Sequence, residues 1–347
     1  MQTNDIDIEL RYLLFKYGKE QIYVLTDENA KNHCLPLLLN SIQIDDKNIM
    51  VLPSGEEHKN LQTTCLIWDF LQTGGATRKS LLVCLGGGVI TDMGGFAAST
   101  FKRGINYVNI PTTLLSAVDA ATGGKTGIDY NGLKNQIGLF SMPEKTIIYT
   151  PFFQTLPHEQ FLSGWAEMLK HALIASPLEL INILAFNLDE IDYSRLAELV
   201  NRSNTIKEYI VEQDPEEKGL RKTLNFGHTI GHALEEYSLN KPDKQPMLHG
   251  YAVMYGMVAE LYISIEKLGF PQKTLTDITH LMIENYGKPI CSCKDYDKLI
   301  ELMRHDKKNT SADCISFTLL KNVGNARIDQ IVKEQEIKEA LDFLFNL

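Results

Sequence analysis

Short apolar runs alternate with amphipathic stretches over the first 150 residues of the chain. Five runs are rich in β-branched residues and end in turn-forming or small polar residues, which is typical of buried strands. They lie at residues 21–27, 48–53, 80–88, 105–113 and 145–150. Amphipathic stretches such as residues 56–74 separate several of them. This alternation predicts a mainly parallel α/β sheet, whose ligands would bind at the carboxyl ends of the strands.

From about residue 151 the hydrophobic pattern takes a helical period. Apolar residues recur every three or four positions in residues 163–174, 188–214, 228–238 and 250–269. One late run, residues 314–324, is compatible with either a strand or a packed loop. We therefore expect a Rossmann-like α/β domain over residues 1–150 and a mostly α-helical domain over residues 151–347.

Composition narrows the class of protein. A chain of 347 residues is long enough for two domains, and 44% hydrophobic with 22% charged residues is typical of a globular protein. A net charge of −10 disfavours nucleic-acid binding. The N-terminus lacks a signal-peptide pattern, and we find no apolar run long enough for a transmembrane helix. The six cysteines are scattered, and only Cys291 and Cys293 are close together. These features predict a cytoplasmic protein with reduced thiols and no membrane partner.

A glycine-rich segment, GGGVITDMGG at residues 86–95, directly follows an apolar run. Its glycines would let the backbone approach a ligand, and a following helix would offer free N–H groups to a phosphate. The segment does not fit the G-x-G-x-x-G dinucleotide fingerprint, so a purely structural turn remains an alternative. Asp92 would either cap the helix or bind a ribose or amide group.

Residues 110–138 combine several polar side chains: Thr112, Thr113, Asp119, Lys125, Lys134 and Asn135. A Gly-Gly-Lys-Thr run at residues 123–126 resembles the end of a P-loop, but the glycine that a P-loop requires at position 119 is an aspartate. What remains is a polar loop with two lysines, which suits a phosphate or a carboxylate. Solvated lysines are the alternative.

Two further patterns could hold a metal. Glu167 and Lys170 lie three apart in an apolar helical stretch, which indicates either a buried group with a partner or an ordinary surface ion pair. His228 and His232 lie four apart, but residue 229 is Thr, so the H-E-x-x-H pattern of metalloproteases is absent. Together with His249, one glutamate and two or three histidines would form a catalytic zinc shell with an open position. Independent structural roles for the histidines are the alternative, and the basic run at residues 304–309 is expected to be solvated.

Taken in order, these motifs resemble the 3-dehydroquinate synthase family of the sugar phosphate cyclase superfamily. The resemblance covers about three-quarters of the chain and rests on the order and spacing of the motifs. They are PSGEEHK (53–59), GGGVITD, RG (103–104), PTTLL, VDAATGGKTG, LKNQIG, TLP (155–157), AEMLK, LRKTLNFGHTIGHALE, HG and DKKN.

The resemblance implies a homodimeric lyase with an NAD-binding N-terminal domain and a helical domain for metal and substrate. It implies conversion of 3-deoxy-D-arabino-heptulosonate 7-phosphate (DAHP) to 3-dehydroquinate and phosphate, in the shikimate pathway of aromatic amino acid biosynthesis. The implied steps are transient oxidation by NAD, phosphate elimination, reduction, ring opening and intramolecular aldol closure.

The resemblance also implies roles for individual residues. The zinc (or cobalt) ligands would be Glu167, His228 and His249. The NAD site would contain Asp27, Glu56, Lys59, Gly87, Gly88, Asp92, Thr112, Thr113, Asp119, Lys134 and Thr155. The substrate site would contain Asp119, Lys125, Lys134, Asn135, Lys170, Lys207, Arg221, Asn225 and His232. Arg103 would reach the phosphate across the dimer, and Lys307 or Lys308 would also contact phosphate.

The sequence departs from the family pattern at several places. Thr91 stands where the family has glycine, Leu133 precedes Lys134 in place of glycine, and Tyr251 follows His249-Gly250 in place of glutamate. The common TLPxRE reads TLPHEQ. None of these changes removes an expected ligand.

Three alternatives remain. An inosose or valiolone synthase would share the NAD and metal motifs but differ around the substrate carboxylate, where this chain has the basic residues expected for DAHP. A plain alcohol dehydrogenase would not need so many anion-binding lysines. A non-catalytic nucleotide- or metal-binding protein would bind without turnover.

Overall fold

The computed structural model describes residues 6–239, 246–289, 291–304 and 315–347. The chain divides into two compact units. Unit 1 contains Met1–Phe161 and Ile191–Asn204, and unit 2 contains Leu162–Glu190 and Thr205–Leu347. Helices α6 (His158–Ala175) and α8 (Tyr193–Gln213) each contribute residues to both units.

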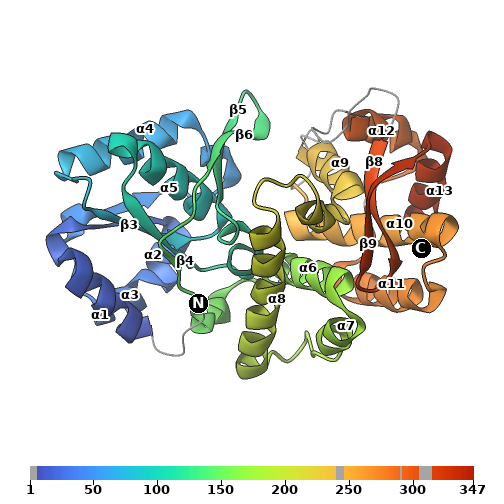
Figure 1. Ribbon diagram of the computed structural model, residues 1–347, viewed down its shortest axis with the longest axis horizontal. Helices are drawn as coiled ribbons and strands as arrows, with labels where there is room; N and C mark the ends of the chain where they lie inside the picture. Colours follow the sequence, from blue (N-terminus) through green and yellow to red (C-terminus); the bar gives the residue numbers. More distant parts are fainter. Residues whose placement is uncertain (1–5, 240–245, 290, 305–314) are drawn as a thin grey trace. The chain divides into compact units, whose positions relative to one another are not determined.

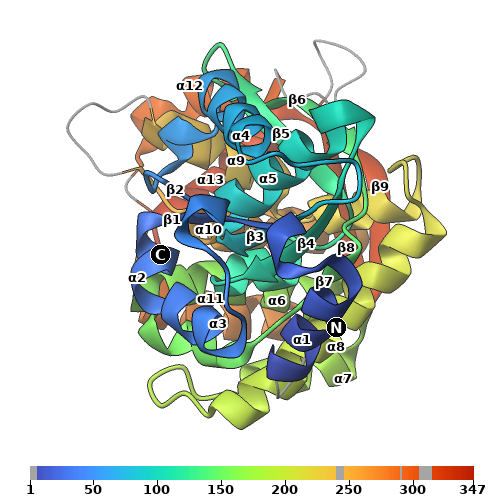
Figure 2. The same cartoon turned by 90° about the vertical axis from the view of Figure 1, so that its left-hand side faces the viewer.

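Unit 1 is built on a five-stranded, entirely parallel sheet with the strand order β2-β1-β3-β4-β7, which can be followed across Figure 2. The strands are β1 (Ile22–Asp27), β2 (Ile49–Leu52), β3 (Leu81–Gly86), β4 (Asn106–Pro111) and β7 (Lys145–Thr146). Strands β1 and β3 are buried nearly throughout, which explains why they appear in the sequence as continuous apolar runs. All five strands lie within the predicted runs, although the run at 145–150 forms only two residues of strand.

Helices cover both faces of this sheet, with α4 and α5 on one face and α1 to α3 on the other (Figure 1). Their bounds are α1 (Ile6–Tyr17), α2 (Glu28–His33), α3 (Leu35–Ser41), α4 (Leu61–Thr73) and α5 (Gly88–Thr100). Alternate strand residues, among them Tyr23, Leu25 and Cys84, form one hydrophobic core with Ile67 of α4 and Met93 of α5. This doubly covered parallel sheet confirms the predicted Rossmann-like class.

A separate antiparallel hairpin, β5 (Lys125–Tyr130) and β6 (Leu133–Phe140), also belongs to unit 1. It was not predicted, because its residues were assigned to a polar loop. Short helical turns complete the unit: η1 (Lys19–Gln21), η2 (Asp46–Asn48), η3 (Glu56–His58), η4 (Phe101–Arg103), the π-helical η5 (Ser116–Ala120) and η6 (Thr150–Thr155). The predicted helix at 56–74 therefore begins as η3 and continues as α4 after a break.

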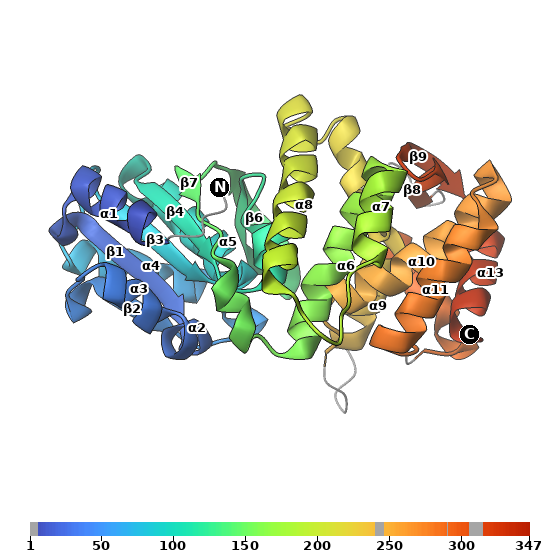
Figure 3. The same ribbon diagram turned by 90° about the horizontal axis from the view of Figure 1, so that it is seen from below.

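Unit 2 is mostly helical, and α10, α11 and α13 run side by side in Figure 3. In addition to its shares of α6 and α8, it contains α7 (Pro177–Leu184), η7 (Leu220–Asn225), α9 (His228–Leu239), α10 (His249–Leu268), α11 (Gln272–Tyr286), η8 (Cys293–Asp295), α12 (Tyr296–Arg304) and α13 (Glu334–Phe345). Its core packs α10 against α9 and against an antiparallel hairpin of β8 (Ile315–Asn322) and β9 (Asn325–Val332). The late run that was compatible with strand or loop is thus a strand.

The helical predictions for this part of the chain are confirmed, with one shift in a boundary: α8 begins at Tyr193, five residues later than the predicted stretch at 188–214. Among the described residues, we find no helix with the length and apolar character needed to cross a bilayer.

Candidate functional site

The carboxyl ends of the strands in unit 1 gather most residues predicted to bind a dinucleotide. Because the strands are parallel, β1, β2, β3 and β4 end at the same edge of the sheet. Asp27 is the last residue of β1, Glu56 and Lys59 follow β2, Gly87 and Gly88 follow β3, and Thr112 and Thr113 follow β4. Hydroxyl groups, carboxylates and glycines at the ends of four different strands therefore lie along the carboxyl edge of the sheet.

The glycine-rich turn after β3 leads directly into α5, with Gly87 as the N-cap residue. A Cβ atom at Gly87 would lie 3.3 Å from Thr113, and one at Gly88 would lie 3.3 Å from Ala120. Both positions are therefore tight for a side chain, and the N-terminus of α5 stays accessible through bare backbone. This is the arrangement by which helix N-termini bind phosphate groups.

Asp27 already has a structural partner. Its Oδ1 accepts hydrogen bonds from Asn29 N and Ala30 N, both at 2.9 Å, and so caps helix α2. Ser54, after β2, donates to the same oxygen at 3.3 Å. The carboxylate is thereby held at the edge of the sheet in one orientation.

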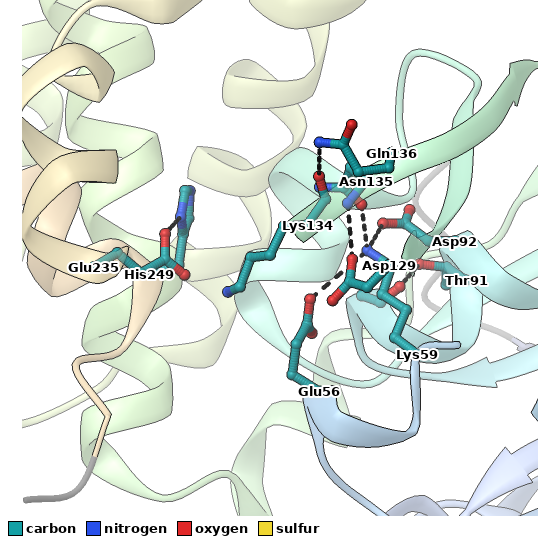
Figure 4. A network of polar contacts seen from close by, with 11 residues as sticks. Glu56, Lys59, Thr91, Asp92, Asp129, Lys134, Asn135, Gln136, Glu235 and His249 are labelled. Atoms are coloured by element: carbon teal, nitrogen blue, oxygen red, sulfur yellow. Dashed lines mark hydrogen bonds and ion pairs between the residues drawn. The ribbon is translucent and has the colours of Figure 1, made fainter. Parts of the chain in front are cut away.

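Lys59 is the centre of a polar cluster that joins three segments of unit 1 (Figure 4). Its ammonium lies 2.7 Å from Asp92 Oδ2 and 2.7 Å from Asn135 Oδ1. Burial lowers the pKa of Lys59, but the carboxylates of Asp92 and Glu56 outweigh burial and raise it above its usual value. Lys59 thereby connects Asp92 of α5 to Asn135 of the β5–β6 hairpin, and Asn135 N donates to Asp129 Oδ1 at 2.7 Å within the hairpin.

The capping role considered for Asp92 is wrong. Helix α5 begins at Gly88, so Asp92 is its fifth residue and lies beyond the free N–H groups of the first turn. Its carboxylate instead pairs with Lys59, which the sequence places 33 positions earlier.

Thr91, where the family has glycine, is accommodated inside unit 1. Only 1% of the residue is exposed. Its hydroxyl lies 3.2 Å from the carbonyl oxygen of Gly88 and 3.3 Å from the hydroxyl of Ser116 in η5. The extra side chain therefore joins the first turn of α5 to the segment that carries Asp119.

The other predicted residues of unit 1 have varied surroundings. Asp119 and Lys134 are half-buried, whereas Lys125 at the start of β5 and Thr155 in η6 are exposed. Arg103 is exposed at the end of η4, where it lines a cavity of about 340 Å³ with Ser99 and Tyr107. Lys102 and Arg103 both have left-handed backbone, with φ of 51° and 67°, which is uncommon for residues other than glycine.

In unit 2 the three predicted metal ligands converge from three helices. Glu167 lies on α6, His228 is the first residue of α9, and His249 is the first residue of α10. Oε1 of Glu167 lies 3.4 Å from Nε2 of His228 and 3.4 Å from Nε2 of His249. These three residues form a group whose ligand atoms lie within 4.8 Å of one another.

The spacing of these atoms fits a tetrahedral metal ion. Ligand atoms about 2.0–2.1 Å from one zinc ion lie about 3.3 Å apart in tetrahedral geometry. The measured separations from Glu167 Oε1 agree with this value. One carboxylate and two imidazoles also leave a coordination position for a substrate oxygen, which is typical of catalytic rather than structural zinc sites.

Close contacts at a glycine and a serine align two of the helices. Gly250, next to His249, lies so close to α6 that a Cβ atom there would be 2.0 Å from the carbonyl oxygen of Ser163. Gly250 N donates to Ser163 Oγ at 3.0 Å. Because Ser163 lies one turn before Glu167, this contact sets His249 beside the carboxylate, and it explains why glycine follows the histidine.

Lys170 pairs with Oε2, the second carboxylate oxygen of Glu167. Both residues are almost fully buried, at 0% and 1% exposure, so the surface ion pair considered as an alternative is wrong. Burial would raise the pKa of Glu167, but Lys170 and the two histidines hold it well below its usual range. The carboxylate is thus ionised, as metal binding requires.

The two histidines differ in their electrostatics. Burial and the charge of Lys170 hold the pKa of His228 well below its usual value. His249 is the opposite case: burial lowers its pKa, but Glu235 and Glu167 outweigh burial and raise it to about 10. His228 therefore offers a free lone pair, whereas metal binding at His249 would release a proton from its ring.

Glu235 is a site residue that the sequence reasoning missed. Its Oε2 lies 3.0 Å from Nδ1 of His249 (Figure 4). Residues 228, 232 and 235 have the spacing of one helix face, and this spacing could have identified Glu235 from the sequence. His232 lies on that face, with its ring centroid 5.1 Å from that of His228 and 6.0 Å from that of His249. A second possible ligand group, His232, Glu235 and His249, shares His249 with the first.

The segment before α9 carries Arg221 and Asn225 on a turn held by several hydrogen bonds. The carboxylate of Asp214 accepts hydrogen bonds from the backbone N–H groups of Lys218, Gly219 and Arg221. Arg221 is buried and donates from Nη1 to the carbonyl oxygen of Pro215, and Asn225 donates to Glu217 at 2.8 Å. Lys207 on α8 is also buried. Lys307 and Lys308 lie outside the described residues.

Comparison with known proteins identifies the family. A model of the 3-dehydroquinate synthase N-terminal domain matches residues 49–163, and a model of the C-terminal domain matches residues 164–309. The chain belongs to the 3-dehydroquinate synthase family. A 3-dehydroquinate synthase of Parabacteroides distasonis is 48% identical over 98% of this chain and 95% of its own length. One of Campylobacter concisus is 37% identical over 93% of this chain and 91% of its own length.

Two solved structures of synthases share the fold. A 2-epi-5-epi-valiolone synthase from Streptomyces hygroscopicus, with NAD+ and Zn2+ bound, has a TM-score of 0.85 at 23% identity and covers 99% of this chain and 95% of its own. A 2-deoxy-scyllo-inosose synthase complexed with carbaglucose-6-phosphate, NAD+ and Co2+ has a TM-score of 0.82 at 23% identity, covering 96% and 93%. At this identity the likeness concerns the fold.

Tyr251 and Leu133, two departures from the family pattern, each lie beside a tyrosine. Tyr251 packs its ring against Tyr286, with centroids 4.9 Å apart, and Tyr286 in turn donates to the carbonyl oxygen of Leu162 at 2.8 Å. Leu133 pairs with Tyr130 at the turn of the β5–β6 hairpin, and 51% of it is exposed. Glu167, His228 and His249 converge in the chain that carries both changes.

Proposed function

We propose that the chain is an NAD- and metal-dependent lyase that converts DAHP to 3-dehydroquinate and phosphate. The observation that carries this proposal is the convergence of Glu167, His228 and His249 on one ligand-sized volume. The relative that is 48% identical over 98% of the chain is a 3-dehydroquinate synthase, whereas the inosose and valiolone synthases are 23% identical. This difference favours DAHP over the substrates of the other cyclases.

The metal site consists of Glu167, His228 and His249 and takes Zn2+ or Co2+, the ions named in the related cyclase structures. When bound, such an ion polarises a substrate hydroxyl and lowers its pKa. The protein supplies one ionised carboxylate and two imidazoles for this purpose. Glu235 fixes the ring of His249 through Nδ1, so that Nε2 faces the ligand volume.

The NAD site lies at the carboxyl edge of the sheet in unit 1. Gly87 and Gly88 leave the start of α5 open to a pyrophosphate, and the polar groups around this edge serve the rest of the dinucleotide. Bound NAD supplies reversible hydride acceptance, so the reaction has no net redox change. The residues assigned to this site are Asp27, Glu56, Lys59, Gly87, Gly88, Asp92, Thr112, Thr113, Asp119, Lys134 and Thr155.

The substrate carries a carboxylate and a phosphate, so a chain of net charge −10 must concentrate positive charge where it binds. In unit 2, Lys170, Lys207 and Arg221 are buried cations, and Arg221 has the planar guanidinium that suits a bidentate anion contact. Asn225 and His232 add hydrogen-bonding groups. In unit 1 the assigned residues are Asp119, Lys125, Lys134 and Asn135.

We further propose that residues 1–150 form the NAD-binding domain, that residues 151–347 form the metal- and substrate-binding domain, and that the enzyme is a cytoplasmic homodimer. Arg103 would serve the phosphate of the partner subunit's substrate, and Lys307 or Lys308 would add a contact. Two observations support the role of Arg103. Its side chain is exposed, and its left-handed backbone costs energy that functional positions often retain.

The decisive experiment is to incubate the purified, zinc-loaded protein with DAHP and catalytic amounts of NAD and to measure phosphate and 3-dehydroquinate. We expect equimolar release of both, loss of both after chelation of the metal, and no accumulation of NADH. Turnover of glucose 6-phosphate or sedoheptulose 7-phosphate, without turnover of DAHP, would instead assign the chain to another cyclase activity.

A further inference from the structure

Helices α9 and α10 approach each other unusually closely at three glycines. A Cβ atom at Gly256 on α10 would lie 1.9 Å from the carbonyl oxygen of Gly227, and one at Gly231 on α9 would lie 3.0 Å from that of Ala252. Gly227 itself has left-handed backbone, with φ of 80°. At Gly256 only glycine permits the distance, and the contact brings the middle of α10 against the first turn of α9.

One turn after Gly256, the side chain of Glu260 reaches the N-terminus of α9. Glu260 is fully buried. Its carboxylate accepts hydrogen bonds from Gly227 N at 2.6 Å, Thr229 N at 3.1 Å and Ile230 N at 3.2 Å. Helices usually have these first N–H groups satisfied by a side chain near their own start. Here a carboxylate from another helix performs that role.

The three donors surround His228. Gly227 precedes it, and Thr229 and Ile230 follow it, so one carboxylate holds the backbone on both sides of the proposed ligand. The imidazole is fixed at its other end, since Nδ1 lies 3.1 Å from the carbonyl oxygen of Phe226 and Nε2 lies 3.4 Å from Glu167 Oε1. A shift of the first turn of α9 would move Nε2 directly.

We propose that Glu260 is a positioning residue that preorganises His228 for metal binding. This inference rests on the proposed function, because it takes Glu167, His228 and His249 as the metal ligands. Glu260 acts through the backbone of His228 and does not itself reach the metal. It complements Glu235, which holds the ring of His249.

The charge of Glu260 is essential to this role. An ionised carboxylate offers two acceptor oxygens to several N–H groups, and negative charge at a helix N-terminus is favourable. A glutamine of the same shape offers one acceptor oxygen and turns an NH2 group toward N–H donors, which leaves at least one donor unsatisfied. Glu260→Gln therefore changes the hydrogen bonds around His228 while almost preserving volume.

The test compares Glu260→Gln and Glu260→Asp with wild type and with Ser176→Ala. Ser176 caps α7 in the same unit by accepting from Glu179 N at 3.3 Å, so its loss weakens a helix start that carries no proposed ligand. Zinc affinity is measured by competition with a chromophoric chelator, at a temperature where each apo-protein is folded. The visible spectrum of the Co2+-loaded proteins reports the ligand geometry independently of turnover.

We expect Glu260→Gln to bind zinc about ten- to a hundredfold more weakly than wild type, with altered cobalt bands. Glu260→Asp should lose less affinity, and it keeps the test decisive if the glutamine variant does not fold. Ser176→Ala should lower the unfolding midpoint while keeping wild-type zinc affinity and cobalt spectrum. Wild-type affinity and spectrum in both Glu260 variants would overturn this inference. Failure of the wild-type protein to bind zinc would instead overturn the proposed function.

Discussion

Nδ1 of His249 lies 3.0 Å from Oε2 of Glu235, while Nε2 of the same ring faces Glu167 Oε1 at 3.4 Å. A carboxylate at Nδ1 fixes the orientation of an imidazole and directs the lone pair of Nε2 to a metal. The relationship makes Glu235 the residue that orients His249.

Replacing Glu235 with alanine should therefore weaken zinc binding by about ten- to a hundredfold, because His249 loses the group that orients it. Competition with a chelator measures the effect. Glu236→Gln is the matched control, since the neighbouring side chain is exposed and should leave zinc affinity unchanged. An unchanged affinity in Glu235→Ala would show that the ring is held by packing alone.

The two histidines of α9 should behave differently when each is changed to alanine. His228→Ala should abolish both zinc binding and turnover, since one of the three protein ligands is lost. His232→Ala should keep stoichiometric zinc but raise the KM for DAHP, because we assign His232 to the substrate. Zinc content after dialysis and steady-state kinetics measure these effects. Retention of one zinc per chain in His228→Ala would refute the ligand assignment.

Lys125→Ala should weaken substrate binding far more than NAD binding. Loss of one charge-assisted hydrogen bond predicts an increase in the KM for DAHP of about ten- to a hundredfold. The Kd for NAD, measured by calorimetry without substrate, should change little. Lys79→Ala removes another exposed lysine of unit 1 and should affect neither value. An equal loss of both affinities in Lys125→Ala would contradict the assigned role.

The sequence predicts the elements of this protein better than it predicts the contacts between them. The apolar runs of β1 and β3 are long enough to be recognised because both faces of the sheet are covered. The β5–β6 hairpin was not predicted because seven of the eight residues in β6 are exposed, so no alternation of apolar and polar residues marks a buried face.

The same limit applies to the candidate site. Residue patterns pointed to Glu167, His228, His232 and His249, and the family resemblance selected Glu167, His228 and His249 as the ligands. It could not reveal that Asp92 pairs with Lys59, or that Glu260 caps α9, because those contacts join segments about 30 positions apart. Burial of Lys170 was also invisible locally, since the same i, i+3 pair occurs on helix surfaces.

The stability of the segment before α9 should depend on pH through Asp214. Partial desolvation raises the pKa of this carboxyl, but hydrogen bonds from Gly219, Lys218 and Arg221 outweigh it and lower the pKa. A depressed folded-state pKa means that Asp214 stabilises the fold above its unfolded pKa of about 3.9, and that this contribution is lost as the pH falls through the lower, folded pKa.

Wild type should therefore be more stable than Asp214→Asn at pH 7, and the difference should shrink as the pH falls below about 4. Urea denaturation of both proteins at pH 7, 5, 4 and 3 measures this difference, with Asp189→Asn as an exposed-carboxylate control. A difference that stays constant over this range would mean that ionisation of Asp214 contributes nothing to the turn.

Thr91 offers a test specific to this chain, because it departs from the glycine expected at this position in the family pattern. The side chain is 1% exposed, and its hydroxyl lies 3.3 Å from Ser116 rather than at the surface of the glycine turn. Thr91→Gly should lower the free energy of unfolding by about 1–2 kcal/mol, since a helix position gains backbone freedom and a buried methyl group is lost.

The Kd for NAD should stay within about twofold of wild type in the same variant, because Gly87 and Gly88, not residue 91, form the open turn. Urea denaturation and calorimetry measure the two quantities, and Thr91→Ser, which keeps the hydroxyl, should lose less stability. Much tighter NAD binding by the glycine variant would show that Thr91 constrains the phosphate-binding turn after all.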